Sequence, residues 1–193
     1  LYATLRAGEY ATFNSLKIYP IASAPKIGVN ADGTFVPGQY KVGRDFPAGD
    51  YVIDYQGSTT IGHLRVDSNS LNLTNSIVGA DLYRGRIYVT LSAGDYFTFD
   101  KGIGYPLAKA PALDKSQPIL QDGMYLVGTD IPSGTYTIAT LNTEWGYVTV
   151  YSDATHKEAS KIMSARLTAD KKVTVADGQY LYVLAGAFAQ LSD

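Results

Sequence analysis

The chain contains no cysteine among its 193 residues, and this absence excludes disulfide bonds, thiolate metal sites and a cysteine nucleophile. Histidine is nearly as rare, because only His63 and His156 are present. Neither stands in a spacing typical of a zinc site or of a catalytic triad. The glycines lie between predicted strands rather than ahead of a helix, so no phosphate-binding loop is indicated. We therefore expect a protein that is not an enzyme and that holds no metal and no cofactor.

Charge of one sign and long apolar runs are also lacking. The formal net charge is −2, and lysine and arginine are scattered along the chain. A nucleic-acid-binding protein usually carries a basic stripe, so we expect no nucleic-acid partner. No segment approaches the roughly 20 apolar residues of a membrane span. The hydrophobic content of 46% still predicts a chain that can build a core.

Tyrosine and glycine are abundant, with 16 and 19 copies. Tyrosine suits a pleated surface with one buried face, and glycine suits the turns between short strands. Alternation of apolar and polar residues predicts strands in the first half at 40–43, 51–55, 63–66, 87–91 and 96–99. The same pattern predicts strands in the second half at 125–127, 136–139, 147–151, 172–175 and 180–184.

A unit of about 85 residues recurs in the sequence. Residues 38–51 read GQYKVGRDFPAGDY, and residues 123–136 read GMYLVGTDIPSGTY. The later strands and turns of the two units also match, with small changes in length. So many ordered matches indicate an internal repeat. We therefore expect an all-β fold of tandem small antiparallel β-sandwich repeats, jelly-roll-like or Greek-key-like.

A partial copy precedes the two full ones, because Tyr2-Ala3-Thr4-Leu5 aligns with Tyr88-Val89-Thr90-Leu91. We expect residues 1–25 to be the closing third of a truncated upstream repeat. Its strands would lack a complete sheet, so we expect them to pair with a neighbouring repeat or with another chain. The predicted division of the rest is a linker at 26–37, a repeat at 38–111, a linker at 112–122 and a repeat at 123–193. Prolines flank both linkers and predict semi-rigid spacers between separate repeats.

The string Gly-x-Tyr-x-Val-Gly-x-Asp-[Phe/Ile]-Pro-x-Gly-x-Tyr at 38–51 and 123–136 is followed by Val-Thr-[Leu/Val]-x-x-Gly-x-Tyr at 89–96 and 173–180. This combination resembles a repeat of secreted, lipid-anchored or otherwise surface-attached proteins of Gram-positive bacteria. The resemblance covers nearly all of both repeats. It implies a β-sandwich and an extracellular or cell-surface location, and it implies no catalytic residue.

The loop shared by both repeats carries Asp45 and Asp130. A carboxylate in a loop can bind Ca²⁺, but Ca²⁺ needs six or more oxygen ligands, and no Asp-x-Asp-x-Asp spacing follows. A structural role is favoured, in which the aspartate accepts hydrogen bonds from loop amides while proline and glycine shape the turn.

The single tryptophan, Trp145, stands beside Glu144 and near Tyr147 and Tyr151. An exposed aromatic ring with polar neighbours is typical of sugar-binding faces, whereas a rim or core aromatic is the structural alternative. These four residues are the candidate ligand-binding residues. The sequence thus favours a non-catalytic extracellular repeat module that acts as a surface spacer or as an adhesion or ligand-binding element. Its ligand would be a glycan or a protein, and a carbohydrate-binding module that uses the exposed aromatics is the alternative.

Overall fold

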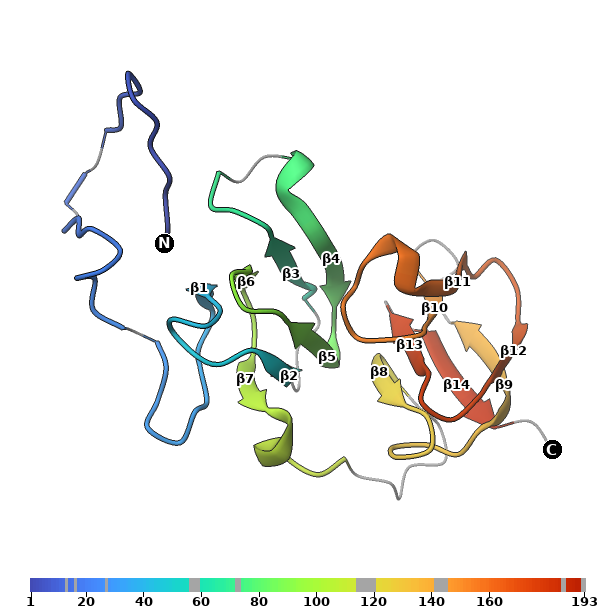
Figure 1. The fold of residues 1–193 in the computed structure, drawn as a ribbon. Coiled ribbons are helices and arrows are strands. Elements are labelled where there is room, and N and C mark those ends of the chain that lie inside the picture. The colour runs from blue at the N-terminus through green and yellow to red at the C-terminus, as the bar shows by residue number, and fades with distance from the viewer. Residues whose placement is uncertain are drawn as a thin grey trace.

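The computed structural model describes residues 1–12, 14–15, 17–26, 28–55, 60–71, 74–113, 121–140, 146–184 and 187–191. Within these residues the regular structure is almost entirely β (Figure 1). The first strand set comprises β1 (Gly38–Lys41), β2 (Gly49–Tyr55), β3 (Gly62–Asp67), β4 (Ile77–Tyr83), β5 (Gly85–Leu91), β6 (Tyr96–Phe99) and β7 (Ile103–Pro106). The second strand set comprises β8 (Gly123–Leu126), β9 (Gly134–Thr140), β10 (Tyr147–Tyr151), β11 (Lys161–Arg166), β12 (Lys171–Val175), β13 (Tyr180–Leu184) and β14 (Ala187–Leu191). Three short 3₁₀ turns, at Thr74–Ser76, Leu107–Lys109 and Glu158–Ser160, complete the regular structure of the described residues.

Each strand set forms one four-stranded and one three-stranded antiparallel sheet. The strand orders are β1-β6-β3-β4 and β5-β2-β7 in the first set, and β8-β13-β10-β11 and β12-β9-β14 in the second. Adding seven to each strand number of the first set gives the order of the second set. The all-β class expected from the alternating pattern is therefore confirmed, and both sets use one topology.

The loop with the shared aspartate has the same geometry in both strand sets. Gly43 and Gly128 each have a φ of +87°, a conformation that suits glycine, and each donates its amide to a carbonyl three residues further on. The Asp45 carboxylate accepts the Lys41 amide at 2.8 Å, and the Asp130 carboxylate accepts the Leu126 amide at 2.8 Å. The predicted role of these aspartates in holding loop amides is confirmed.

The core of the first strand set is an aromatic cluster centred on Phe35, which is completely buried. The Phe35 ring stacks on Phe46 at 4.7 Å between centroids and meets Tyr51 and Phe99 edge-on. Its backbone forms an antiparallel bridge with Gly104. Residues 26–37 were expected to be a linker, and this expectation does not fit the position of Phe35. Burial of a large aromatic side chain makes this stretch part of the first core.

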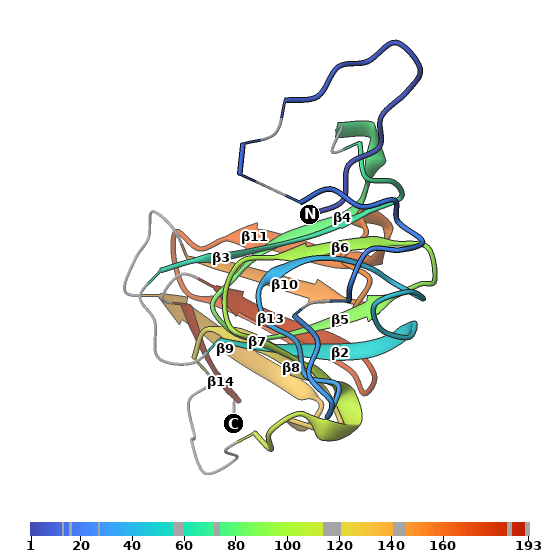
Figure 2. The same cartoon turned by 90° about the vertical axis from the view of Figure 1, so that its left-hand side faces the viewer.

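The two strand sets pack directly against each other rather than standing apart as separate beads. Five side chains of the second set are buried in the same hydrophobic cluster as the first core, namely Met124, Tyr151, Ala154, Tyr182 and Leu184. Strand β5 also runs beside β8. Figures 1 and 2 show the second set lying against the β4–β5 side of the first. The expectation of spaced beads is thus wrong, because apolar surface is buried between the sets. The second predicted linker, 112–122, lies mostly outside the described residues.

The described residues of 1–25 form no strand, so their expected pairing with a sheet of this chain is not seen (Figure 1). They are instead attached by side-chain hydrogen bonds. The Arg44 guanidinium donates to the carbonyl oxygens of Ile21 and Ala24, and the Tyr2 amide donates to the side-chain oxygen of Gln39 at 2.6 Å. Pairing with another chain stays a prediction.

Replacement of Phe35 by alanine tests its position in the core. Phe35→Ala should lower the free energy of unfolding by about 4 kcal/mol, because it removes a buried ring and leaves a cavity. Val36→Ala is the matched control, since Val36 is 40% exposed, and it should change the value by less than about 1 kcal/mol. Urea unfolding curves measure both changes. Equal and small effects would contradict the assignment of Phe35 to the core.

Candidate functional site at the contact between the strand sets

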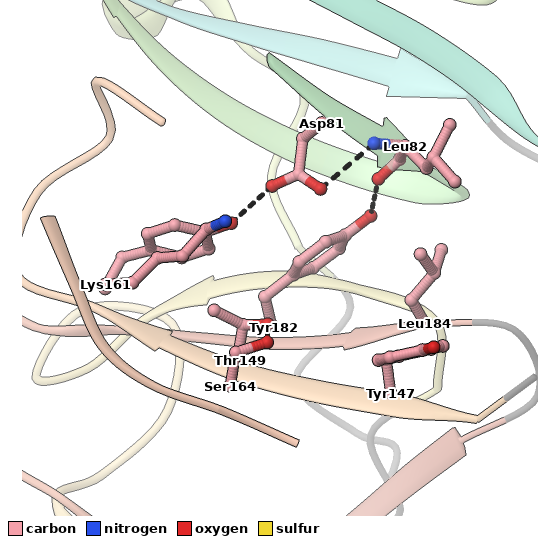
Figure 3. Close-up of a pocket in the computed structure, with 9 residues that line it drawn as sticks. Asp81, Leu82, Tyr147, Thr149, Lys161, Ser164, Tyr182 and Leu184 are labelled. Carbon is pink, nitrogen blue, oxygen red and sulfur yellow. Dashed lines mark hydrogen bonds between the residues drawn. The ribbon is translucent and has the colours of Figure 1, made fainter. Parts of the chain in front are cut away.

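A small pocket opens where β4 of the first strand set meets β10, β11 and β13 of the second. Its volume is about 170 Å³. The pocket is lined by Asp81, Leu82, Tyr147, Thr149, Tyr151, Lys161, Ser164, Tyr182 and Leu184 (Figure 3). Ligand pockets for small molecules usually measure about 300–1,000 Å³, so this one is small for a cofactor or a drug-sized ligand.

The structure places two of the four candidate ligand-binding residues at this pocket. Tyr147 is 40% exposed and lines its rim, whereas Tyr151 is only 1% exposed. The Tyr151 hydroxyl is also used inside the protein, where it donates to Asp81. Tyr151 is therefore not an exposed aromatic, contrary to what a sugar-binding face requires. Trp145 and Glu144 lie outside the described residues.

Asp81 of β4 is the polar centre of the contact. Its Oδ2 accepts the Tyr151 hydroxyl at 2.5 Å and lies 3.1 Å from Nδ1 of His156. Its Oδ1 accepts the Leu82 amide at 3.0 Å, as Figure 3 shows. The side chain of Asp81 is 18% exposed and that of His156 is fully buried. One carboxylate of the first set thus binds two buried side chains of the second.

His156 bonds to the first strand set through both ring nitrogens. Its Nε2 lies 2.6 Å from the carbonyl oxygen of Tyr88, and because a carbonyl only accepts, Nε2 carries a hydrogen. The Nδ1 atom on the other side of the ring faces the Asp81 carboxylate at 3.1 Å. The backbone of His156 has a φ of +56°, which is uncommon outside glycine and which these contacts hold in place.

Further polar contacts cross between the sets. The Tyr88 hydroxyl donates to Asp130 at 2.6 Å, and the Tyr182 hydroxyl donates to the carbonyl oxygen of Leu82. Arg84 forms an ion pair with Asp122 at 3.0 Å. Together with the buried apolar side chains, these contacts give the interface both area and a defined register.

Burial controls the ionisation of the tyrosines in this contact. Desolvation raises the pKa of the Tyr151 hydroxyl above its ordinary value, and the neighbouring Asp81 charge raises it further. Burial and the Asp81 charge also raise the pKa of Tyr182. For Tyr88, burial is again the largest cause, followed by its hydrogen bond to Asp130. All three hydroxyls consequently stay neutral hydrogen-bond donors across the usual pH range.

Three other polar side chains of the pocket, Thr149, Ser164 and Lys161, are paired within the protein. Thr149 and Ser164 share a hydrogen bond of 2.9 Å, and Lys161 donates to Glu158 at 2.8 Å. Among the residues described, no cluster of three or more metal-ligating side chains occurs. In the same part of the chain, no helix has the length and apolar character needed to cross a membrane. The arrangement that the geometry supports is a non-covalent joint between the two sets.

Sequence reasoning missed Asp81, His156, Tyr88 and Tyr182 as contact residues. A signal was nevertheless present, because the two halves of the sequence differ at these places. The equivalent strands have Ala165 at the position of Asp81, Lys172 at that of Tyr88 and Thr98 at that of Tyr182.

Comparison of the chain with protein-family models, with curated proteins and with solved structures finds no match in any of the three.

The Asp81→Ala variant tests the polar centre of the contact. It should lower the free energy of unfolding by about 3 kcal/mol, because the buried Tyr151 hydroxyl would lose its acceptor and His156 would lose a polar partner. Asp170→Ala is the control, since Asp170 is an exposed aspartate of the second set. Thermal and urea unfolding measure the difference. An Asp81→Ala protein as stable as the control would show that the contact contributes nothing.

Proposed function

We propose that this chain is a non-catalytic extracellular repeat module that acts as a surface spacer or as an adhesion or ligand-binding element. In this proposal the two strand sets are copies of one sandwich-like unit of about 85 residues. The observation that carries it is the identical order of the strands in both sets, offset by seven strands. The recurring loop with its aspartate, at Gly43–Phe46 and Gly128–Ile131, supports the same conclusion.

The contact between the sets supports a mechanical role. A flexible linker lets two units sample many orientations, whereas a buried interface with paired polar groups holds one orientation. Met124, Tyr182 and Leu184 supply the apolar part of that interface, and Asp81 with His156 supplies the polar part. A stack of such units would hold its outer end at a defined distance from its point of attachment. Repetition would also add avidity if each unit bound a ligand weakly.

The carbohydrate-binding alternative receives less support. It requires exposed aromatic rings that stack on sugars, and the ring of Tyr151 is buried while its hydroxyl is bound to Asp81. Tyr147 remains exposed beside the pocket, but the pocket measures only about 170 Å³. A glycan or a protein ligand would then bind elsewhere on the module.

The proposed location rests on the motif's resemblance to surface-attached bacterial proteins, and protease treatment of intact cells tests it. Cells that produce the protein are treated with a protease that does not enter them, and antibodies then detect this protein and a cytoplasmic marker. We expect the protein to be degraded while the marker persists. A protein that stays intact until the cells are lysed would contradict the proposed function.

A further inference from the structure

Two tyrosines at matching positions make the same contact in this structure. The Tyr88 hydroxyl donates to Asp130 at 2.6 Å, and its ring lies 5.4 Å from the ring of Tyr180. The Tyr2 hydroxyl donates to Asp45 at 2.5 Å, and its ring lies 5.6 Å from the ring of Tyr96. All three members of the contact correspond in the repeat alignment. Tyr2 corresponds to Tyr88, Asp45 to Asp130 and Tyr96 to Tyr180.

The residues that follow the two donors also match. Thr4 follows Tyr2 by two positions, and Thr90 follows Tyr88 by two positions. Thr4 shares a hydrogen bond of 2.5 Å with Ser70, and the Thr90 amide donates to the carbonyl oxygen of Ala154 at 2.8 Å. Ser70 and Ala154 both stand three residues after the end of an equivalent strand, β3 and β10. Both segments therefore contact the loop that follows an equivalent strand, Thr4 through its side chain and Thr90 through its backbone.

We propose that Asp45 and Tyr96 form an acceptor site for the segment equivalent to β5 of a preceding unit of the same kind, with Tyr2-Ala3-Thr4-Leu5 as that segment. Asp130 and Tyr180 form the corresponding acceptor site of the second strand set, and β5 of the first set occupies it. This inference rests on the proposed repeat organisation and names the partner that each unit receives. Units then join in one direction, from donor tyrosine to acceptor aspartate.

The pKa of Tyr2 and the charges around it support a specific contact at the first acceptor site. Burial raises the pKa of the Tyr2 hydroxyl to about 12, and the Asp45 charge adds to the effect, so the hydroxyl stays a donor. Arg44 donates to the same hydroxyl at 2.7 Å and is paired with Asp45. The aspartate also holds the Lys41 amide at 2.8 Å, which fixes the carboxylate before any donor arrives.

The second strand set lacks the donor half of this joint. Lys172, which is exposed, stands at the position of Tyr88, and a lysine ammonium cannot reproduce the ring contact with an acceptor tyrosine. The second set therefore offers no tyrosine ring at the position from which Tyr88 of the first set contacts its acceptor.

Limited proteolysis of the purified full chain tests the acceptor site. Trypsin cleaves after Arg6, four residues beyond the proposed donor. Tyr2→Ala should raise the rate of this cleavage by about tenfold, because loss of a hydrogen bond to a charged group increases the population of the released segment. Tyr10→Ala is the matched control, since Tyr10 is fully exposed in the same segment, and its rate should equal that of the unmodified protein. Equal rates for Tyr2→Ala and Tyr10→Ala would overturn the proposal.

A second variant tests the direction of the joint. Tyr2→Lys places at position 2 the residue found at 172, and it should raise the cleavage rate as much as Tyr2→Ala does. An unchanged rate for Tyr2→Lys would overturn the statement that lysine cannot act as donor. Both measurements use purified protein, so a negative result would contradict the contact at Tyr2 but not the proposed cell-surface location. Conversely, a protein that resists protease on intact cells would contradict the proposed location but not the contact at Tyr2.

Discussion

Buried tyrosine hydroxyls that need an acceptor are the constraint on which the arrangement of this molecule depends. A hydroxyl removed from water costs free energy unless it donates to a partner. Tyr151 and Tyr88 find their partners in the other strand set, at Asp81 and Asp130. Because the two bonds run in opposite directions between the sets, neither set can slide or rotate without breaking one of them. Apolar side chains such as Met124 and Leu184 then fill the space between.

The aspartate shared by the two loops accepts two kinds of hydrogen bond, one from its own loop and one from a tyrosine outside it. These two roles explain why it belongs to the motif. Asp130 holds the Leu126 amide within its own loop and receives Tyr88 from the other strand set with the same oxygen. Asp45 does the same with Lys41 and Tyr2. The fold of the loop and its contact with a tyrosine from outside the loop therefore use one carboxylate. A loop that has folded correctly is also ready to receive its neighbour.

The sequence predicted what depends on local periodicity and missed what depends on contacts between distant residues. Alternating residues located β2 and β13, and turn chemistry predicted the role of Asp45 within its loop. Phe35 was missed because it stands in a polar, turn-rich stretch without alternation, and its partner Phe99 lies far along the chain. His156 and Asp81 were missed because they are 75 residues apart and have no counterparts in the other copy. Tyr151 was assigned to an exposed face because its burial is caused by the first strand set.

A distance measurement between spin labels tests directly whether the two strand sets form one rigid body. The chain has no cysteine, so Ser92→Cys and Ala176→Cys provide two unique labelling sites at exposed, equivalent turn positions. Pulsed electron paramagnetic resonance then reports the distribution of distances between the labels. A rigid contact predicts one narrow distribution. A broad distribution, as from two beads on a linker, would contradict the account.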